Sequence, residues 1–212
     1  MKLIGMLDSP YVRRVAISLQ MLGLPRFEHQ SISVFRGFDA FHAINPVVKA
    51  PTLVCDDGQV MMESSLILTY AEALVRPRTL WPNTLPELQR ALRLTGLALT
   101  ACEKSAQIVY ERGLRPPEKL HEPWLTRVTN QLLAAYGELE REQAARPLVA
   151  TREAIDQAGI SAAVAWHFTQ QTLPGVVPPG EHPNLVAFSA QAEALPEFQA
   201  APHGEGTYRH GG

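Results

Sequence analysis

The stretch that decides the fold is KLIGMLDSPYVRRVAISLQMLGL, residues 2–24. Its first apolar residues, within 3–7, form a run of strand length that is too short to predict a long helix. A helix is predicted next, because Ser9 is a hydroxyl residue suited to an N-cap and Pro10 suits the first helical position. Apolar residues then recur at helical spacing before a glycine that favours a helix end: Val12, Val15, Leu19, Leu22 and Gly23.

The hydroxyl of Ser9 is thereby placed beside the positive end of a helix dipole. Such a position suits an anion, and in particular a thiolate. Taken alone, Ser9 is explained better by helix capping than by chemistry. The functional interpretation gains its weight from residues further along the chain.

The bulk properties of the chain exclude several classes of function. Its 212 residues fit one large domain or two small ones, with 46% hydrophobic and 19% charged residues. A formal net charge of −2 gives no electrostatic argument for nucleic acid or an anionic membrane as partner. No apolar run approaches the ~18 residues of a membrane span, and the N-terminus lacks the pattern of a secretory signal. A soluble cytoplasmic protein is therefore expected.

Cysteine and histidine spacing adds to this expectation. Cys55 and Cys102 form neither a CxxC motif nor a disulfide framework, which favours a reducing compartment. The seven histidines are scattered without metal-ligand spacing, so no metal site is predicted. Residues 1–78 carry eight Lys/Arg against seven Asp/Glu, which leaves eleven against fourteen for the remainder of the 19 and 21 in the chain. This slight basic bias mildly favours the N-terminal part as the binding region for a small anion.

The first part of the chain alternates strand and helix patterns. After the opening strand and helix, the sequence predicts a short strand within 27–33, an irregular helix over 35–44, a hairpin of 52–55 and 59–62 around the turn 56–58, and a helix from 63 to 74. Prolines at 77 and 82 then mark a linker.

Everything after the linker is predicted to be helical. Apolar residues recur at helical spacing over 88–109, 123–139, 161–168 and 184–192, and 196–200 adds a last turn or two. Ser161 is expected to be the N-cap of its helix, with Val164 at position N3. Gly204 to Gly212 is polar and glycine-rich, and is expected to be disordered and dispensable.

This order of elements, with four local motifs, resembles the glutathione S-transferase family over roughly residues 1–203. The motifs are Ser9-Pro10-Tyr11-Val12-Arg13-Arg14-Val15, Asn45-Pro46 through Pro51-Thr52-Leu53, Glu63-Ser64-Ser65-Leu66-Ile67-Leu68-Thr69-Tyr70, and His182-Pro183-Asn184-Leu185 through Leu195-Pro196. Each motif alone is weak, but together and in order they are specific. The resemblance implies a thioredoxin-like α/β domain over 1–78, with a mixed four-stranded sheet, then an all-α domain over 84–203 and a tail over 204–212.

The resemblance also implies a site for glutathione, with Ser9 as the catalytic residue that holds its thiolate. Ala50 would pair its backbone with the cysteinyl unit, which requires a cis peptide at Pro51. Glu63 and Ser64 would hold the γ-glutamyl end, and Lys49 would reach the glycyl carboxylate. Read without the family, Lys49 is a solvated lysine. Glu63 and Ser64 fit a plain helix cap as well as they fit a ligand contact, and the two roles are compatible. Candidate acceptor-site residues are Tyr11, Phe35, Ser105 and Ile108.

Two departures from the family pattern limit what the resemblance implies. The Ser9 motif contains no cysteine, which disfavours disulfide and reductase chemistry. Val164 stands where the family's helical domain has an aspartate, so the reciprocal bond of a capping box is missing.

The leading hypothesis is thus an enzyme that activates glutathione as a thiolate for attack on a small electrophile, and that forms a homodimer as its relatives do. One alternative is glutathione-dependent isomerisation or dehalogenation with the same thiolate. Another is a non-catalytic protein that uses the fold for protein contacts, although such a protein has no need of all of Ser9, Lys49, Pro51, Glu63 and Ser64.

Overall fold

The chain forms two compact units in a computed structural model, which describes residues 1–24 and 26–209. The first unit combines Met1–Leu80 with the segment from Ala194 onward, and the second is Trp81–Glu193. The sequence predicted instead one helical domain over 84–203, whereas the structure groups the last helix with the N-terminal unit. Within the described ranges, no helix is both long and apolar enough to cross a membrane.

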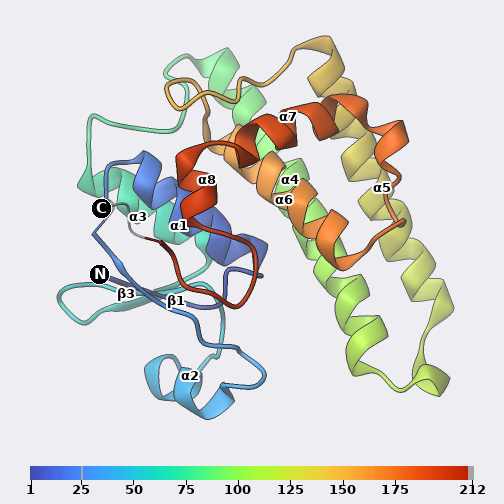
Figure 1. Cartoon of the computed structure of the whole chain (residues 1–212), viewed down its shortest axis with the longest axis horizontal. Coiled ribbons are helices and arrows are strands. Elements are labelled where there is room, and N and C mark those ends of the chain that lie inside the picture. Colours follow the sequence, from blue (N-terminus) through green and yellow to red (C-terminus); the bar gives the residue numbers. More distant parts are fainter. Residues whose placement is uncertain (25, 210–212) are drawn as a thin grey trace. The chain divides into compact units, whose positions relative to one another are not determined.

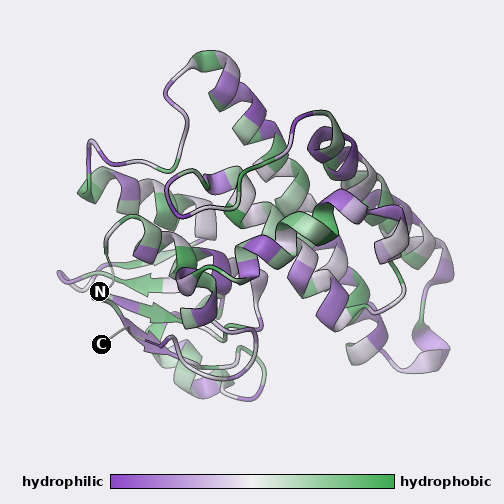
Figure 2. Cartoon of the chain, turned by 45° about the horizontal axis from the view of Figure 1, so that its top comes forward, coloured by the Kyte–Doolittle hydropathy of each residue, from purple (hydrophilic) through white to green (hydrophobic). Residues whose placement is uncertain are grey.

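The first unit is a four-stranded mixed sheet flanked by helices, as predicted. In chain order its elements are β1 (Lys2–Ile4), α1 (Pro10–Met21), β2 (Glu28–Gln30), α2 (Phe38–Ile44), β3 (Thr52–Val54), β4 (Val60–Met62), α3 (Ser64–Leu74) and α8 (Pro196–Ala200). The strand order is β2-β1-β3-β4, with β1 and β2 parallel and the other two pairs antiparallel. Helices α1 and α3 lie on one side of the sheet and α2 on the other (Figures 1 and 2).

Apolar pairing sets the register of the sheet. Leu3 of β1 lies opposite Leu53 of β3, and both side chains are fully buried. If one strand shifted by one residue relative to the other, its apolar side chains would move to the opposite face of the sheet, so this pair specifies the register strongly. The return to β4 is the predicted hairpin, where Gly58 adopts a φ of 85° that favours glycine.

The second unit is helical throughout its regular elements. It contains α4 (Leu85–Leu114), the 3₁₀ turn η1 (Pro117–Lys119), α5 (Glu122–Ala145), α6 (Gln157–Thr172), the turn η2 (Pro179–Glu181) and α7 (Pro183–Glu193). Helix α6 packs against both α4 and α7 and is buried along most of its length (Figure 1). Tyr136 of α5 donates a hydrogen bond of 2.8 Å to the carbonyl of Ala165, which fixes α5 on this central helix.

The expected start of α6 at Ser161 is wrong. The N-cap is Asp156, whose Oδ1 accepts a hydrogen bond of 2.8 Å from the N–H of Gly159. Ser161 and Val164 lie inside the helix, with 2% and 1% of their surface exposed. The apolar periodicity started at 161 only because the first turn of α6 is itself buried and contains small residues, so that it shows no amphipathic pattern.

The expectation of a disordered tail is also wrong for the described part of it, residues 204–209. Tyr208 is 4% exposed, and its ring centroid lies 4.7 Å from that of Phe27. Its backbone N–H donates a hydrogen bond of 2.9 Å to Nδ1 of His29. The buried tyrosine of this segment has no periodic apolar neighbours, which is why the sequence pattern gave no sign of docking. Residues 210–212 of that expectation lie outside the described residues.

Substitution of Val164 by aspartate should destabilise the protein. Since the position is buried in the helical unit, the carboxylate would lose its hydration without a partner, at a cost of roughly 3–5 kcal/mol. Asp156→Ala removes only the cap and should cost about 1 kcal/mol. Urea denaturation of the three proteins measures both values, and a Val164→Asp protein as stable as the wild type would contradict the assigned helix start.

Tyr208→Ala should lower the free energy of unfolding by about 3 kcal/mol, the size of a large-to-small change at a buried aromatic position. The matched control is Thr207→Ala, because Thr207 is exposed in the same segment. Equal midpoints of denaturation for the two variants would show that the segment does not dock.

Candidate glutathione site

The Ser9 turn, residues 5–9, connects β1 to α1 and places a hydroxyl at the start of the helix. Ser9 is the N-cap of α1, with extended backbone angles and a half-buried side chain. Its Oγ lies 3.5 Å from the N–H of Val12, which is a long hydrogen bond and therefore a weak cap. The hydroxyl consequently lies at the N-terminus of a twelve-residue helix without being fully used by it.

A glycine brings this turn against the segment before β3. Gly5 has a φ of 132°, and a Cβ on it would lie 2.7 Å from Val12 and 3.0 Å from Ala50. No larger residue fits, because real Cβ atoms do not approach other atoms so closely. Since Ile4 is opposite Thr52 in the sheet, the turn after β1 and the Ala50–Pro51 bond lie side by side. That peptide bond is cis, as the sequence resemblance implied.

Asn45 organises the loop that carries Lys49 and Ala50. Its side-chain amide donates 2.8 Å to Thr52 Oγ1, which itself donates 2.7 Å to the carbonyl of Lys49. The Asn45 Oδ1 accepts a hydrogen bond from the N–H of Val47 at 3.0 Å. Asn45 is 3% exposed, so this network is internal, whereas Lys49 is exposed. The sequence motif contained Asn45, but its role in shaping the loop was not predicted.

Glu63 and Ser64 follow directly on β4. Since Met62 of β4 is opposite Thr52, the start of α3 lies at the same edge of the sheet as the cis peptide. Glu63 is the N-cap of α3, and its carboxylate accepts hydrogen bonds of 3.2 Å from the N–H groups of Ser65 and Leu66. Its φ of 75° is unusual for a residue with a side chain. Such local backbone strain is often found at functional sites.

A residue that the sequence interpretation missed lies behind Ser64. Arg14 of α1 is 2% exposed, and its Nη1 donates hydrogen bonds of 3.2 Å to the hydroxyls of both Ser64 and Ser65. A guanidinium thus adds positive charge beneath the helix start where an anionic ligand group is expected. The signal was present in the sequence, because α1 contains two adjacent arginines and no acidic residue that could pair with them along the helix.

The neighbouring Arg13 contacts the last helix of the unit, α8. Its Nε donates 2.7 Å to the carbonyl of Ala201, and its guanidinium lies 5.7 Å from the ring centroid of Phe198. Both partners belong to the end of α8. The carbonyls at a helix C-terminus favour a cation, so Arg13 fixes α8 on α1.

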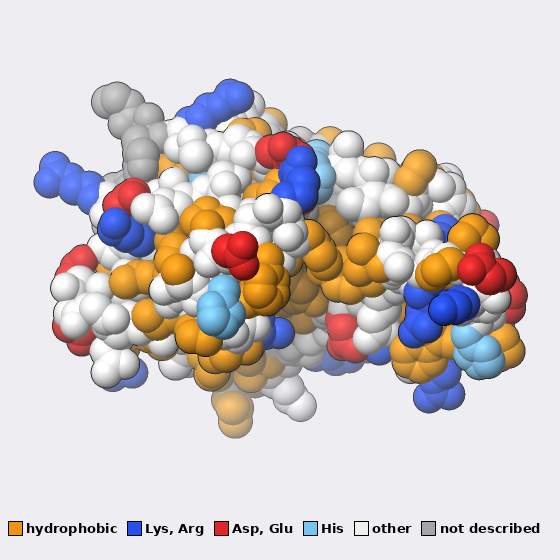
Figure 3. Space-filling model, turned by 90° about the horizontal axis from the view of Figure 1, so that it is seen from below, with side chains coloured by type: hydrophobic (Ala, Val, Ile, Leu, Met, Phe, Trp, Pro, Cys, Tyr) orange, Lys and Arg blue, Asp and Glu red, His pale blue; other side chains and the backbone are white. Residues whose placement is uncertain are grey.

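The candidate acceptor residues fall into two groups. In the first unit, Tyr11 is half-buried near the start of α1, and Phe35 is 54% exposed. Phe38 of α2 and Val47 are also exposed, and Figure 3 views the molecule from the side of this helix. An acceptor-site role for Tyr11 and Phe35 stays a prediction.

The two candidates in the second unit lie in its interior. Ser105 of α4 is fully buried, and its Oγ lies 2.8 Å from Oγ1 of Thr169 on α6. The Thr169 hydroxyl is also 2.6 Å from the phenol oxygen of Tyr136. Ile108 is fully buried too. Both residues have the surroundings of ordinary core positions, and an acceptor-site role for them stays a prediction.

The charge next to Ser9 is set by Asp8. Burial raises the pKa of the Asp8 carboxyl above its usual value, and the N–H of Ser9 lowers it through a hydrogen bond. Glu205 raises this pKa further, whereas Arg36 lowers it. The Ser9 turn therefore lies within electrostatic range of the loop after β2 and of the C-terminal segment.

The described residues, 1–24 and 26–209, contain no group of three or more His, Cys, Asp or Glu side chains that could hold a metal ion. What they do bring together, at one edge of the sheet, is a hydroxyl at a helix start, a loop backbone before β3, and the start of α3. Such an arrangement provides hydrogen-bond donors and positive helix ends for an extended anionic peptide.

Comparisons with known proteins agree with this geometry. Residues 3–79 match the family described as "Glutathione S-transferase, N-terminal domain". A glutathione transferase family member from Pseudomonas fluorescens Pf-5, solved with bound S-(propanoic acid)-glutathione, is 30% identical, with a TM-score of 0.82 over 95% of this chain and 98% of that one. A glutathione S-transferase from Methylobacterium radiotolerans, in complex with glutathione sulfonate, is 26% identical, with a TM-score of 0.85 over 94% and 93% of the two chains.

A curated relative is the uncharacterized GST-like protein YibF of Escherichia coli, which is 27% identical over 140 residues, or 66% of this chain and 68% of that protein. The match in sequence and fold along nearly the whole length, together with the geometry at the sheet edge, shows that this chain belongs to the glutathione S-transferase family.

Proposed function

We propose that the protein is a glutathione transferase that activates the thiol of glutathione for attack on a small electrophile. The observation that carries the proposal is the half-buried Ser9 hydroxyl at the N-terminus of α1, at the sheet edge shared with Ala50 and Ser64. Relatives over nearly the full chain have been solved with glutathione or its derivatives bound, which supports glutathione as the ligand.

In this proposal four contacts hold glutathione in an extended form. Ala50 pairs its backbone with the cysteinyl unit, and the exposed Lys49 attracts the glycyl carboxylate. The γ-glutamyl carboxylate binds near the Ser64 hydroxyl, where Arg14 adds positive charge. Glu63 faces the amine of the same unit while its carboxylate caps α3. Capping and ligand binding are compatible, because a carboxylate offers about four acceptor positions.

Ser9 acts as a hydrogen-bond donor to the thiolate and is neither nucleophile nor base. A free thiol has a pKa near ~8.5, so only a few per cent is thiolate at pH 7. A hydrogen bond to a charged acceptor contributes about 1.5–3 kcal/mol, and a helix N-terminus adds roughly 0.3–1 kcal/mol. Before desolvation is subtracted, the sum lowers the thiol pKa by ~1.5–3 units. Bound glutathione is then largely thiolate at neutral pH.

The reaction follows from that charge state. The thiolate sulfur forms a bond to the electrophilic carbon of the acceptor. In a substitution the leaving group departs with its electron pair; in an addition the π electron pair moves to the neighbouring atom, which then accepts a proton. Isomerisation or dehalogenation of one particular metabolite uses the same thiolate. We assign the reaction to the cytoplasm, a reducing compartment that suits two free cysteines, Cys55 and Cys102.

Retention on immobilised glutathione, followed by assays on a panel of electrophiles, separates these functions. Retention with turnover of several electrophiles is the result we expect. Turnover of a single substrate type would favour the isomerase or dehalogenase. Retention without any turnover would favour a binding protein.

Ser9→Ala should raise the pKa of the bound thiol and slow turnover by about one to two orders of magnitude, in line with losing ~1.5–3 kcal/mol. Glutathione affinity should change little, because the contacts at Ala50, Glu63 and Ser64 remain. The measurement is the thiolate absorbance of bound glutathione as a function of pH, in the wild type and the variant.

Denaturation of the same variant serves as the control. Because the capping hydrogen bond from Val12 to Ser9 is long, its loss should lower the free energy of unfolding by only about 0.5 kcal/mol, the low end of N-cap values. Superimposable absorbance curves would mean that Ser9 is only a cap and that another group, such as Tyr11, activates the thiol.

We further propose that the protein is a homodimer in which α3 contributes to the interface. Leu66 and Leu74 of this helix are 59% and 49% exposed, on the side that also carries the half-buried Tyr70. Exposed apolar side chains grouped on one helix are typical of an interaction surface. A second copy of the chain is the partner that the family resemblance implies.

Leu66→Glu should convert the dimer into a monomer, since it places a charge in a contact that excludes water. The control is Ala144→Glu, which adds the same charge at an exposed position of α5. Sedimentation velocity at several concentrations distinguishes the two states. A wild-type protein that sediments as a monomer, or a Leu66→Glu variant that remains dimeric, would contradict this interface.

A further inference from the structure

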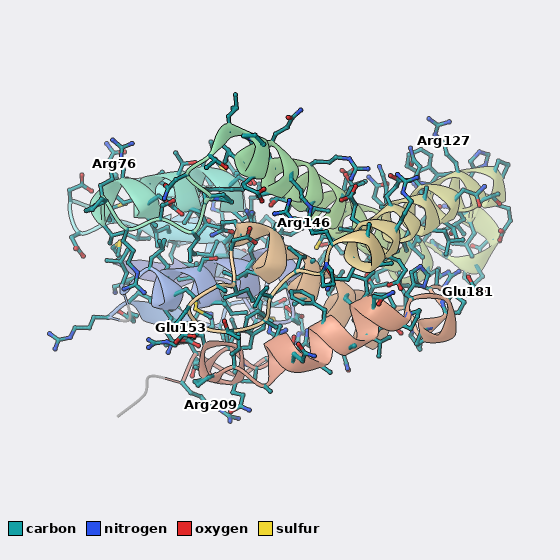
Figure 4. The ribbon with its side chains drawn as sticks, turned by 90° about the horizontal axis from the view of Figure 1, so that it is seen from above. Arg76, Arg127, Arg146, Glu153, Glu181 and Arg209 are labelled. Atoms are coloured by element: carbon teal, nitrogen blue, oxygen red, sulfur yellow. The ribbon has the colours of Figure 1, made fainter. Side chains whose placement is uncertain are left out.

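The C-terminal segment, residues 204–209, is built into the first unit at several points. Besides the contacts of Tyr208 with Phe27 and His29, the N–H of Arg209 donates a hydrogen bond of 2.7 Å to the carbonyl of Ala200. The Ser31 hydroxyl donates 2.6 Å to the carbonyl of Glu205. Figure 4 shows the side chain of Arg209 projecting away from the ribbon, so this residue is held by its backbone.

The histidine beneath the segment ties it to the Ser9 turn. Nδ1 of His29 accepts the hydrogen bond from Tyr208, so Nε2 carries the ring hydrogen in the neutral side chain. That nitrogen donates 2.7 Å to the carbonyl of Gly5. His29 is 8% exposed, and it thus joins the C-terminal segment to the first residue of the Ser9 turn through one buried ring.

The segment also places a carboxylate beside that turn. Glu205 forms an ion pair with Arg36, which lies in the loop after β2 next to Phe35. Both Glu205 and Arg36 act on the pKa of Asp8, the residue before Ser9. Hydrogen bonds give this position its geometry: Glu205 is bonded to Ser31, and the residue before Ser31, Gln30, accepts a hydrogen bond of 3.0 Å from the N–H of Gly5 in the Ser9 turn.

We propose that residues 205–209 form a fixed rim of the site, and that the carboxylate of Glu205 makes the enzyme discriminate against acceptors that carry a negative charge. The proposal rests on the proposed function, because it concerns acceptors attacked by a thiolate held at Ser9. Glu205 acts by neutralising Arg36, which would otherwise attract an anionic acceptor. It is a positioning and specificity residue and does not touch the reacting atoms.

The test uses two acceptors that differ in charge alone. One is a neutral nitro-activated aryl chloride, and the other is the same ring with a carboxylate. In both, the thiolate forms the carbon–sulfur bond and chloride leaves with its electron pair. The ratio of kcat/KM for the anionic acceptor to kcat/KM for the neutral one is measured at saturating glutathione. Differences in expression or in the amount of active enzyme cancel in this ratio.

Glu205→Gln should raise the ratio about two- to fivefold, the size of a charge interaction at an exposed site, and the gain should shrink at high salt. Arg36→Gln should lower the ratio. Thr207→Ala, which changes an exposed residue of the same segment without altering charge, should leave it unchanged. As a readout independent of activity, the pKa of the Asp8 carboxyl, followed by NMR, should fall in Glu205→Gln because a neighbouring negative charge is removed.

The outcomes separate the two proposals. If both acceptors are turned over and Glu205→Gln leaves the ratio of their kcat/KM values unchanged, the proposed role of Glu205 is wrong while the proposed function stands. The same Asp8 pKa in the wild type and in Glu205→Gln would also contradict the proposed role of Glu205, since it would show that Glu205 is not near the Ser9 turn. A wild-type protein that turns over neither acceptor would overturn the proposed function and this inference with it.

Discussion

The first unit depends on the burial of two adjacent cations in α1. Removing a guanidinium from water costs several kcal/mol unless hydrogen bonds replace its hydration. Hydrogen bonds replace part of that hydration and run in opposite directions: Arg13 donates to carbonyls at the end of α8, and Arg14 donates to hydroxyls at the start of α3. Neither residue could keep these bonds if α1 were displaced, so the pair fixes the helix that presents Ser9.

This constraint explains why the last helix belongs to the first unit. Helix α8 follows α7 in the chain but supplies the acceptors that Arg13 requires. Once α8 is fixed there, the residues after it run back over β2, where Tyr208 finds its contact with Phe27 and His29. The C-terminal segment is thus brought to the Ser9 turn by the same interaction that anchors the helix.

The strands and helices of the first unit were predictable because their patterns are local. The Ser9-Pro10 helix start, the hairpin around Gly58 and the helix after Glu63 each depend on a few consecutive residues, and the structure has all three. The start of α6 and the docking of Tyr208 were not predictable in the same way. A helix buried on all sides shows no period, and one anchoring side chain shows no pattern.

In the candidate site too, residues in local motifs were named as site residues from the sequence, whereas those whose partners lie on other elements were not. The sequence motifs named Ser9, Ala50 and Glu63 by resemblance to the family, and their role in binding glutathione stays a prediction. They did not identify the roles of Arg14 or Asn45, whose partners lie on other elements or across a turn and become visible only in three dimensions. Ser105 was named by the resemblance alone, and the helical period could not show that its hydroxyl pairs with Thr169 inside the unit.

The central claim is that the protein holds glutathione as a thiolate, and the most direct measurement is the number of protons released on binding. Calorimetric titration at pH 7.5 in buffers of different ionisation enthalpy gives this number, with S-methylglutathione as a ligand that has no thiol proton to lose. The account predicts roughly 0.7–0.9 more protons released for glutathione than for S-methylglutathione, because the free thiol pKa is about 8.5 and the bound one ~1.5–3 units lower. Equal proton release for the two ligands would contradict it.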